Sequence, residues 1–174
     1  MVSHPTIKAY QHLVLVGLMG TGKSTVGRVL SQRLQRRLID TDAIVESRAG
    51  RTVRQIFADE GETYFRKLES EILVEALEST PPAVIAAAGG VVLAAENRAV
   101  LKASKSRVVW LSADPELLTT RVKSAGHRPL LDQDPGGALR QMADSRQALY
   151  REVAHVIVSV EGRTPTEVAD AILR

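Results

Sequence analysis

Cysteine is absent from all 174 residues of the chain. Its absence excludes disulfides, thiolate nucleophiles and zinc–thiolate sites, and it favours a reducing compartment, so we expect a cytoplasmic protein. Long apolar runs are also missing, because the longest candidate, Val84 to Ala95, contains two glycines and predicts a buried strand that runs into a loop. The first eleven residues lack the apolar segment of a secretory signal. We therefore expect no membrane partner.

Charge of one sign is not concentrated anywhere. The 23 Lys and Arg side chains include 17 Arg, the formal net charge is only +3, and the basic residues are scattered along the chain. Nucleic-acid-binding proteins instead carry a basic stripe or patch. Arginine suits bidentate contacts with small planar anions. The composition therefore argues against nucleic acid as a partner and favours small anionic substrates.

The length and the 44% hydrophobic composition suit a single domain, residues 1–174, whose core begins at about residue 12. Short apolar runs predict strands, and the longer segments between them show helical periodicity. The pairs Asp114-Pro115 and Thr164-Pro165 predict two helix starts. This alternation predicts an α/β fold with a parallel sheet, helices on both faces, and ligands at the carboxyl edge of the strands. The predicted strands span residues 12–16, 37–39, 83–87, 107–111 and 155–158.

The most informative motif follows the first predicted strand. Residues 17–24 read GLMGTGKS, the pattern of a phosphate loop, and a helical segment comes next. The glycines allow the backbone N–H groups to turn inward, Lys23 can bridge the β- and γ-phosphates, and Ser24 can ligate Mg²⁺. The alternative is a glycine-rich turn that only joins strand to helix, and the flanking elements favour the phosphate site. We expect ATP to contact Gly20, Thr21, Gly22, Lys23, Ser24 and Thr25.

A phosphate loop needs a second oxygen ligand for the magnesium ion, usually an aspartate at the end of a neighbouring strand. The second predicted strand runs into Asp40-Thr41-Asp42. If the chain stays extended there, both carboxylates point the same way. We then expect Asp40 to address Mg²⁺ through water and Asp42 to orient or deprotonate the acceptor hydroxyl. The alternative is that either acid caps a helix beginning near Ala43.

Other side chains that could bind a substrate have ordinary structural alternatives. Phenylalanine is usually buried and arginine usually lies on a solvated helix face, so Phe57, Phe65 and Arg66 alone do not indicate a site. Gly89 and Gly90, after the third strand, would allow close approach of a ligand, or they form a simple turn. Spacing alone leaves both alternatives open.

Residues 124–137 contain three glycines and two prolines and predict a mobile lid. Phosphoryl transfer requires a site that closes against water, and closure could bring Arg128 to the γ-phosphate. Arg146, on the helical segment that follows, could also bind an anion. Loop and surface arginines are as often solvated charges, so neither role follows from position alone.

Taken together, the motifs resemble the shikimate kinases, small phosphate-loop kinases of aromatic biosynthesis. The resemblance runs from about residue 12 to the end of the chain. It implies a three-layer α/β/α fold of the nucleoside monophosphate kinase group, with five parallel strands in the order 2-3-1-4-5. It also implies transfer of a phosphoryl group from ATP to the 3-hydroxyl of shikimate, with Mg²⁺ as cofactor and a monomeric enzyme. The matching segments are GLMGTGKS at 17–24, DTD at 40–42, IFADEGETYFRKLE at 56–69, and GHRPLL at 126–131 followed by SRQALYREVA.

The resemblance implies a role for each matching residue. Asp42 would contact and help activate the attacking hydroxyl, while Arg66 and Arg146 would grip the shikimate carboxylate. Lys23 and Arg128 would act on the transferred phosphoryl group, and residues 42–70 would form the shikimate-binding segment. The other matches are Ser24 and Asp40 for Mg²⁺, Phe57, Phe65, Gly89 and Gly90 for the shikimate pocket, Glu69 beside its arginines, Arg121 and Pro165 for adenine, and Pro129 and Leu130 beside Arg128.

Two positions depart from the family pattern. Ala88 stands where a first glycine is usual, which is harmless if its φ is negative, and Met19 replaces a frequent proline in the phosphate loop. Two alternatives remain. One is a related kinase for gluconate or a nucleoside monophosphate, which would lack the aspartate pair and the downstream arginines. The other is a nucleotide-binding module without catalysis, which the intact set of polar residues does not favour.

Overall fold

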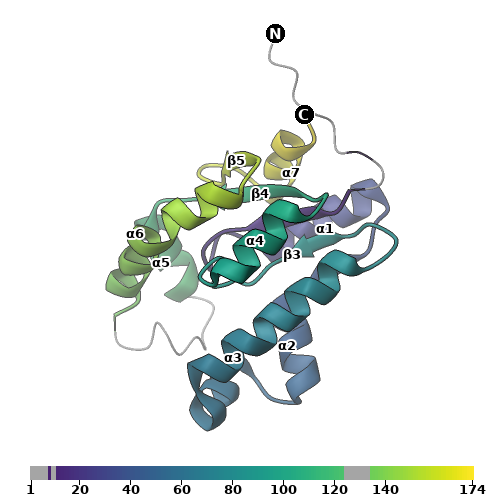
Figure 1. Ribbon diagram of the computed structural model, residues 1–174. Coiled ribbons are helices and arrows are strands. Elements are labelled where there is room, and N and C mark those ends of the chain that lie inside the picture. Colours follow the sequence, from purple (N-terminus) through teal and green to yellow (C-terminus); the bar gives the residue numbers. More distant parts are fainter. Residues whose placement is uncertain (1–7, 9–10, 124–133) are drawn as a thin grey trace.

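The computed structural model describes residue 8 and residues 11–123 and 134–174. One parallel sheet lies at its centre, with the strands in the order β2-β3-β1-β4-β5 (Figure 1). Each strand overlaps one of the predicted apolar runs, so the predicted sheet and its strand order are confirmed. The strands are β1 (Leu13–Val16), β2 (Leu38–Asp40), β3 (Val84–Ala86), β4 (Arg107–Ser112) and β5 (Val156–Ser159).

Helices cover both faces of the sheet and give the three-layer arrangement. Because side chains alternate along a strand, Leu13 and Leu15 of β1 pack toward one face and Val14 and Val16 toward the other. All four are fully buried, as expected for the central strand of a doubly covered sheet. The first face packs on α1 (Lys23–Leu34) and α7 (Pro165–Leu173), and the second on α3 (Val53–Glu78), α4 (Ala95–Ala103), α5 (Pro115–Lys123) and α6 (Pro135–Val153).

Helices α2 (Thr41–Ala49) and α3 pack together beside β2 and β3 and contain the segment expected to bind shikimate. Val45, Ile56 and Phe65 belong to a separate small core that joins them. Helix α3 is not straight: Gly61 has φ 82° and ψ 173°, which interrupts the helix between its short first part and its long second part. Phe57 lies before this bend and Phe65 lies after it, and their rings remain in contact.

Both predicted helix starts are confirmed. Thr164 and Glu167 form a reciprocal capping box at the start of α7, and the Asp114 carboxylate accepts a hydrogen bond from the Glu116 N–H at the start of α5.

The predicted lid is wrong at its end, because Asp134 caps α6 and Pro135 occupies its first turn, so residues 135–137 are helical. Residues 124–133 of that segment lie outside the described residues.

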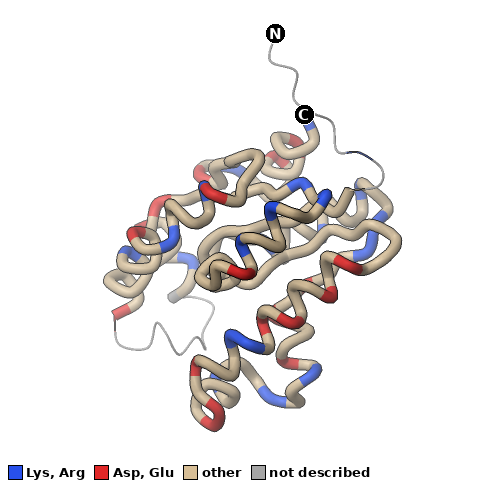
Figure 2. Tube along the Cα trace, viewed as in Figure 1, with Lys and Arg blue, Asp and Glu red and all other residues tan. Residues whose placement is uncertain are grey.

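Acidic and basic residues are both spread over the helices, and α3 carries more acidic than basic residues (Figure 2). Arg48 pairs with Glu75 between α2 and α3, and Arg51 pairs with Asp59 and Glu60 across the first part of α3. None of the helices in the described ranges is long and apolar enough to cross a membrane.

Candidate active site

The phosphate loop has the backbone shape that its sequence predicts. Gly17, Gly20 and Gly22 have φ values of 144°, 84° and 86°, a region that residues with a side chain rarely adopt. A Cβ at Gly17 would lie 2.5 Å from the Leu111 carbonyl oxygen, so the loop also packs directly on β4. The loop leads into the first turn of α1, whose N-terminal dipole favours an anion.

The polar side chains of this loop are held in place. The Lys23 ammonium donates to the carbonyl oxygens of Gly17 at 2.8 Å and Leu18 at 3.0 Å, which holds its charge against the loop. Thr21 is buried and its hydroxyl donates to the Leu18 carbonyl. Thr25 is exposed on the first turn of α1. These residues form a compact cationic cradle.

Ser24 and Asp40 lie together beside the cradle. The Ser24 hydroxyl donates to a carboxylate oxygen of Asp40 at 2.5 Å, although the two residues come from different elements. A hydroxyl and a carboxylate are both hard oxygen ligands, and Mg²⁺ commonly takes one or two protein oxygens and completes its shell with water and phosphate. The described residues contain no group of three or more His, Cys, Asp or Glu side chains that could bind a metal. The pair therefore fits Mg²⁺ that arrives with a nucleotide.

The expectation of an extended chain at 40–42 is wrong. Helix α2 begins at Thr41, and Asp40 is its N-cap, with its side chain accepting from the Ala43 N–H at 3.4 Å. The capping alternative is therefore confirmed for Asp40, which makes the cap with one oxygen and contacts Ser24 with the other. Asp42 lies in the first turn of α2 and is half-buried. The helical turn, rather than an extended strand end, sets the directions of the two acids.

Across the edge of the sheet, α3 carries a buried ion pair. Arg66 donates to both carboxylate oxygens of Glu69, at 2.9 and 3.1 Å, and also contacts Glu62 at 3.1 Å. The Glu69 side chain is only 1% exposed, whereas 21% of the Arg66 side chain remains exposed. Part of the Arg66 side chain therefore remains exposed to solvent, while Glu69 holds its guanidinium through two hydrogen bonds.

Several charges converge on Glu69. Burial is the largest influence and raises the pKa of its carboxyl group, and Arg66 opposes that rise. Asp42 raises the same pKa further and Arg146 lowers it. Asp42, Arg66 and Arg146 therefore act on one buried carboxyl group, which brings together three residues that are far apart in sequence.

Gly90 makes room for Arg66. A Cβ at this position would lie 1.8 Å from the terminal nitrogen Nη1 of Arg66, so the guanidinium occupies the space that a side chain would need. Ala88 is not among the described residues with positive φ, and its N–H donates to the Thr41 hydroxyl at 2.9 Å. The substitution of alanine for the usual glycine therefore introduces no left-handed strain.

Gly89 lies between the two halves of the site. A Cβ there would be 3.3 Å from the Gly17 carbonyl oxygen, so its backbone lies against the phosphate loop. Its own carbonyl accepts hydrogen bonds from Arg146 Nη1 at 3.3 Å and from the Tyr150 hydroxyl. Arg146 is 6% exposed, and its Nε has no partner among the described residues.

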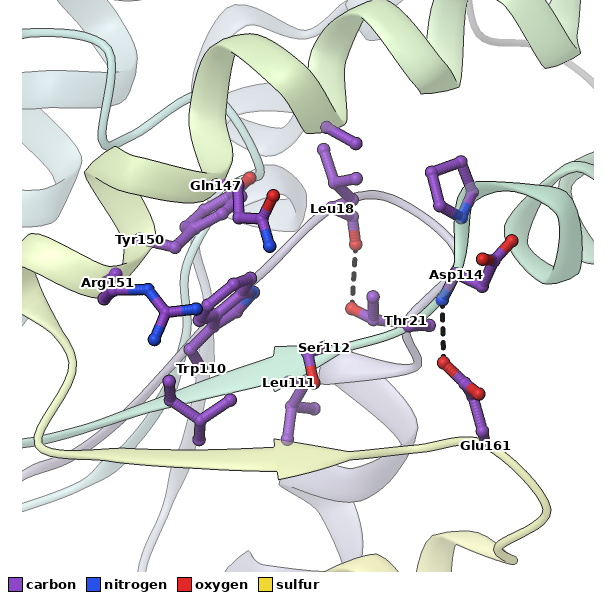
Figure 3. Close-up of a pocket in the computed structure, with 14 residues that line it drawn as sticks. Leu18, Thr21, Trp110, Leu111, Ser112, Asp114, Gln147, Tyr150, Arg151 and Glu161 are labelled. Carbon is purple, nitrogen blue, oxygen red and sulfur yellow. Dashed lines mark hydrogen bonds between the residues drawn. The ribbon is translucent and has the colours of Figure 1, made fainter.

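Tyr150 supports this arrangement. Its hydroxyl is buried, which raises its pKa to about 12, so it remains a hydrogen-bond donor to Gly89 at physiological pH. Its ring stacks on Trp110 at a centroid distance of 5.7 Å. Figure 3 shows Tyr150 and Trp110 beside Gln147 and Arg151 in a pocket of about 350 Å³ that borders the phosphate loop. Trp110 is 7% exposed and belongs to the core on this face of the sheet.

The remaining expected residues are placed as follows. Phe57 and Phe65 are in contact, with ring centroids 4.8 Å apart, and Arg66 lies over the Phe65 ring at 5.3 Å. Arg121 of α5 donates to the Gly20 carbonyl at 3.3 Å, which puts it beside the phosphate loop. Pro165 is exposed at the first position of α7. Arg128, Pro129 and Leu130 lie outside the described residues.

Sequence reasoning gave no role to two residues that hold the site together. Thr41 is 1% exposed and uses its hydroxyl to tie the start of α2 to Ala86 and Ala88 at the end of β3. Tyr150 fixes the Gly89 carbonyl beside Arg146. Thr41 stands between the two aspartates and Tyr150 stands four residues after Arg146, one helical turn away, but neither position indicates a contact with the backbone at the end of β3 or in the turn after it.

A parallel sheet whose first strand runs through a glycine loop into the start of a helix is the architecture of the phosphate-loop nucleotide-binding proteins. A family model described as shikimate kinase matches residues 19–174. The chain belongs to the shikimate kinase family.

Individual relatives agree with this assignment. The shikimate kinase of Symbiobacterium thermophilum is 46% identical over 165 residues, which cover 93% of this chain and 94% of that protein. The shikimate kinase of Streptomyces coelicolor is 44% identical over 161 residues, which cover 92% of each. A solved structure of shikimate kinase from Acinetobacter baumannii in complex with shikimate matches with a TM-score of 0.89 and 38% identity, covering 94% of this chain and 90% of that one.

Proposed function

We propose that this protein transfers the γ-phosphoryl group of ATP to the 3-hydroxyl of shikimate by direct in-line displacement. The observation that carries the proposal is the position of Gly89, whose backbone lies against the phosphate loop while its carbonyl is held by Arg146. The phosphate loop, which would hold the phosphoryl donor, and a second anion site lined by arginines therefore meet at Gly89. Family membership supports shikimate as the ligand of the second site.

The donor half would act mainly by positioning and charge. Backbone N–H groups of the loop and the start of α1 would receive the phosphates, and the Lys23 ammonium would exchange its loop carbonyls for the β- and γ-phosphate oxygens. Arg121 would hold the nucleotide from the side of Gly20. Phosphoryl transfer needs little covalent chemistry from the protein, so most of the rate would come from this preorganisation.

Ser24 and Asp40 would hold Mg²⁺, Ser24 directly and Asp40 through water. When bound, the ion neutralises charge on the β- and γ-phosphate oxygens. The N-cap contact with Ala43 holds the Asp40 side chain at the start of α2 before the ion arrives.

The acceptor half would grip the substrate carboxylate between Arg66 and Arg146. Glu69 holds the Arg66 guanidinium and Tyr150 holds the carbonyl that Arg146 contacts, so both arginines would be oriented before the substrate binds. Phe57 and Phe65 would pack against the ring of the acceptor. Asp42 would accept a hydrogen bond from the attacking hydroxyl and orient it, or take its proton as transfer proceeds.

An ADP-release assay with MgATP and a panel of acceptors tests this function. Shikimate, quinate, gluconate and AMP are compared at equal concentration, with a blank that lacks acceptor. We expect ADP release well above the blank with shikimate and little with gluconate or AMP. Release that is no faster with shikimate than in the blank would contradict the proposal, and release with gluconate or AMP instead would assign the site to a related kinase.

A further inference from the structure

A second cavity lies along the edge strand β5, next to α7, and none of its lining residues belongs to the phosphate loop. Its volume is about 270 Å³, and β5 and the last turn of α7 form most of its wall. Helix α7 packs beside β5, as Figure 1 shows. Three arginines line this cavity, Arg107, Arg163 and Arg174, and no acidic residue of the described chain does. The described lining therefore combines apolar side chains of β5 and α7 with three basic side chains.

Arg107 is the unusual member of this set. It is the first residue of β4 and only 8% exposed, and its Nε atom is buried with no hydrogen-bond partner among the described residues. Burial lowers the pKa of its guanidinium, and no neighbouring carboxylate offsets this effect. A buried N–H group without a partner is costly, and native proteins rarely keep one without a reason.

The other two arginines lie toward opposite ends of the same cavity. Arg163 donates to the carbonyl of Ser159, the last residue of β5, and Arg174 follows the end of α7. Both are exposed, and neither forms an ion pair with a described residue. The acids of α7 are engaged elsewhere, since Glu167 caps the helix through Thr164 and Asp170 pairs with Arg33. Arg163 lowers the pKa of Glu167, but less than the hydrogen bonds with Thr164 do.

We propose that this cavity binds a small molecule that carries a phosphate or carboxylate group, with Arg107 as its buried partner. A planar guanidinium matches both oxyanions through paired hydrogen bonds, and the exposed arginines would draw the anion in from solvent. The apolar side chains of β5 and α7 would pack against a compact body attached to that group. The site is separate from the phosphate loop and from the acceptor arginines, and it does not depend on the proposed reaction.

Nuclear magnetic resonance on ¹⁵N-labelled protein tests the site directly. Inorganic phosphate and citrate are titrated separately, with ADP present to occupy the nucleotide loop and with ionic strength held constant by sodium chloride. We expect saturable shifts of the Val156–Ser159 amides and of the Arg107 Nε–H signal. A stronger response to phosphate assigns a phosphorylated ligand, and a stronger response to citrate assigns a carboxylate.

Arg107→Met provides the matched variant, because an apolar side chain of similar length can fill the same space. It should weaken anion binding at β5 by at least about tenfold, the loss expected for one charge-assisted contact. Arg140→Met, which removes an exposed cation on α6, should leave the affinity unchanged. If Arg107→Met does not fold, the double variant Arg163→Met, Arg174→Met should show the same loss. Shifts confined to residues 17–25, or equal affinity in the variants, would overturn the proposal.

Discussion

Arg66 occupies the space in which a side chain at Gly90 would lie, and this contact gives a sharp prediction. Gly90→Ala would put a Cβ 1.8 Å from Arg66 Nη1, and the flexible end of Arg66 would move away from Glu69. We expect the KM for shikimate to rise at least about tenfold, because one charge-assisted contact to the carboxylate is lost. The KM for ATP and the thermal midpoint should change little.

Gly136→Ala is the control for this variant, since its Cβ would meet nothing closer than 3.5 Å and its φ is not positive. Steady-state kinetics on both variants separate the effect of Arg66 from that of an added methyl group. A Gly90→Ala enzyme with normal affinity for shikimate would show that Arg66 does not contact the acceptor. A large fall in the thermal midpoint would show instead that Gly90 serves folding rather than binding.

Glu69 predicts how stability depends on pH. Burial raises the pKa of its carboxyl group above the ordinary value of 4.5, so the folded protein binds this proton more tightly than the unfolded chain does. The contribution of Glu69 to the free energy of unfolding should therefore be fully present below pH 4.5 and decrease as pH rises through the folded pKa. Each tenfold difference in proton affinity between the folded and unfolded states corresponds to about 1.4 kcal/mol of this free energy.

Glu69→Gln removes this titration while keeping the shape of the side chain. Urea unfolding of both proteins between pH 4.5 and 7.5 should show wild type losing stability relative to the variant as pH rises. The opposite trend would mean that Arg66 and Arg146 outweigh burial and hold the pKa below its ordinary value. Groups common to both proteins cancel in the comparison.

At the scale of single elements, the bend in α3 is the feature that shapes the acceptor side. Gly61 adopts φ 82° and ψ 173°, a conformation open to glycine and costly for other residues, and a Cβ there would meet nothing within 4 Å. Gly61→Ala should therefore destabilise the fold by about 1–3 kcal/mol through backbone strain alone. Urea unfolding measures this loss, with Gly136→Ala as the matched control.

A functional consequence should accompany the strain. Phe57 lies before the bend and Phe65 after it, and their rings are 4.8 Å apart. A change of backbone at Gly61 would alter that contact, so the KM for shikimate should rise while that for ATP stays near its wild-type value. Unchanged stability in Gly61→Ala would contradict the claim that alanine is strained at this position. An unchanged KM for shikimate would show that the bend does not shape the acceptor site.

Sequence patterns predicted elements well where the pattern is local. Each predicted apolar run overlaps a strand. The five runs are short, rich in β-branched and aliphatic residues, and separated by amphipathic helices, so the pattern that predicts them is local. The bend at Gly61 was not predicted, because a glycine inside a helical pattern does not reveal its φ. The start of α2 was placed too late, because the contact of Thr41 with the Ala88 N–H after β3 is tertiary in origin.

For the whole molecule, the phosphate loop indicated a nucleotide site without any structure. The acceptor side could be assigned only through the resemblance, because Arg66, Gly89 and Arg146 stand on three separate segments. Their convergence depends on the sheet order, which brings the end of β3 between β2 and β1. Thr41 and Tyr150 were missed for a related reason: each acts on a backbone group of β3 or of the turn after it, and no spacing in the sequence reports such a contact.

The central claim is that the loop and the two arginines serve different substrates. The most direct measurement is the KM for shikimate and for ATP in Arg66→Ala and Arg146→Ala, with Lys23→Ala as the reverse case. We expect each arginine variant to raise the KM for shikimate by about 10- to 100-fold, with the KM for ATP within about twofold of wild type. Lys23→Ala should instead impair nucleotide use. An equal loss of ATP affinity in the arginine variants would contradict the division of the site.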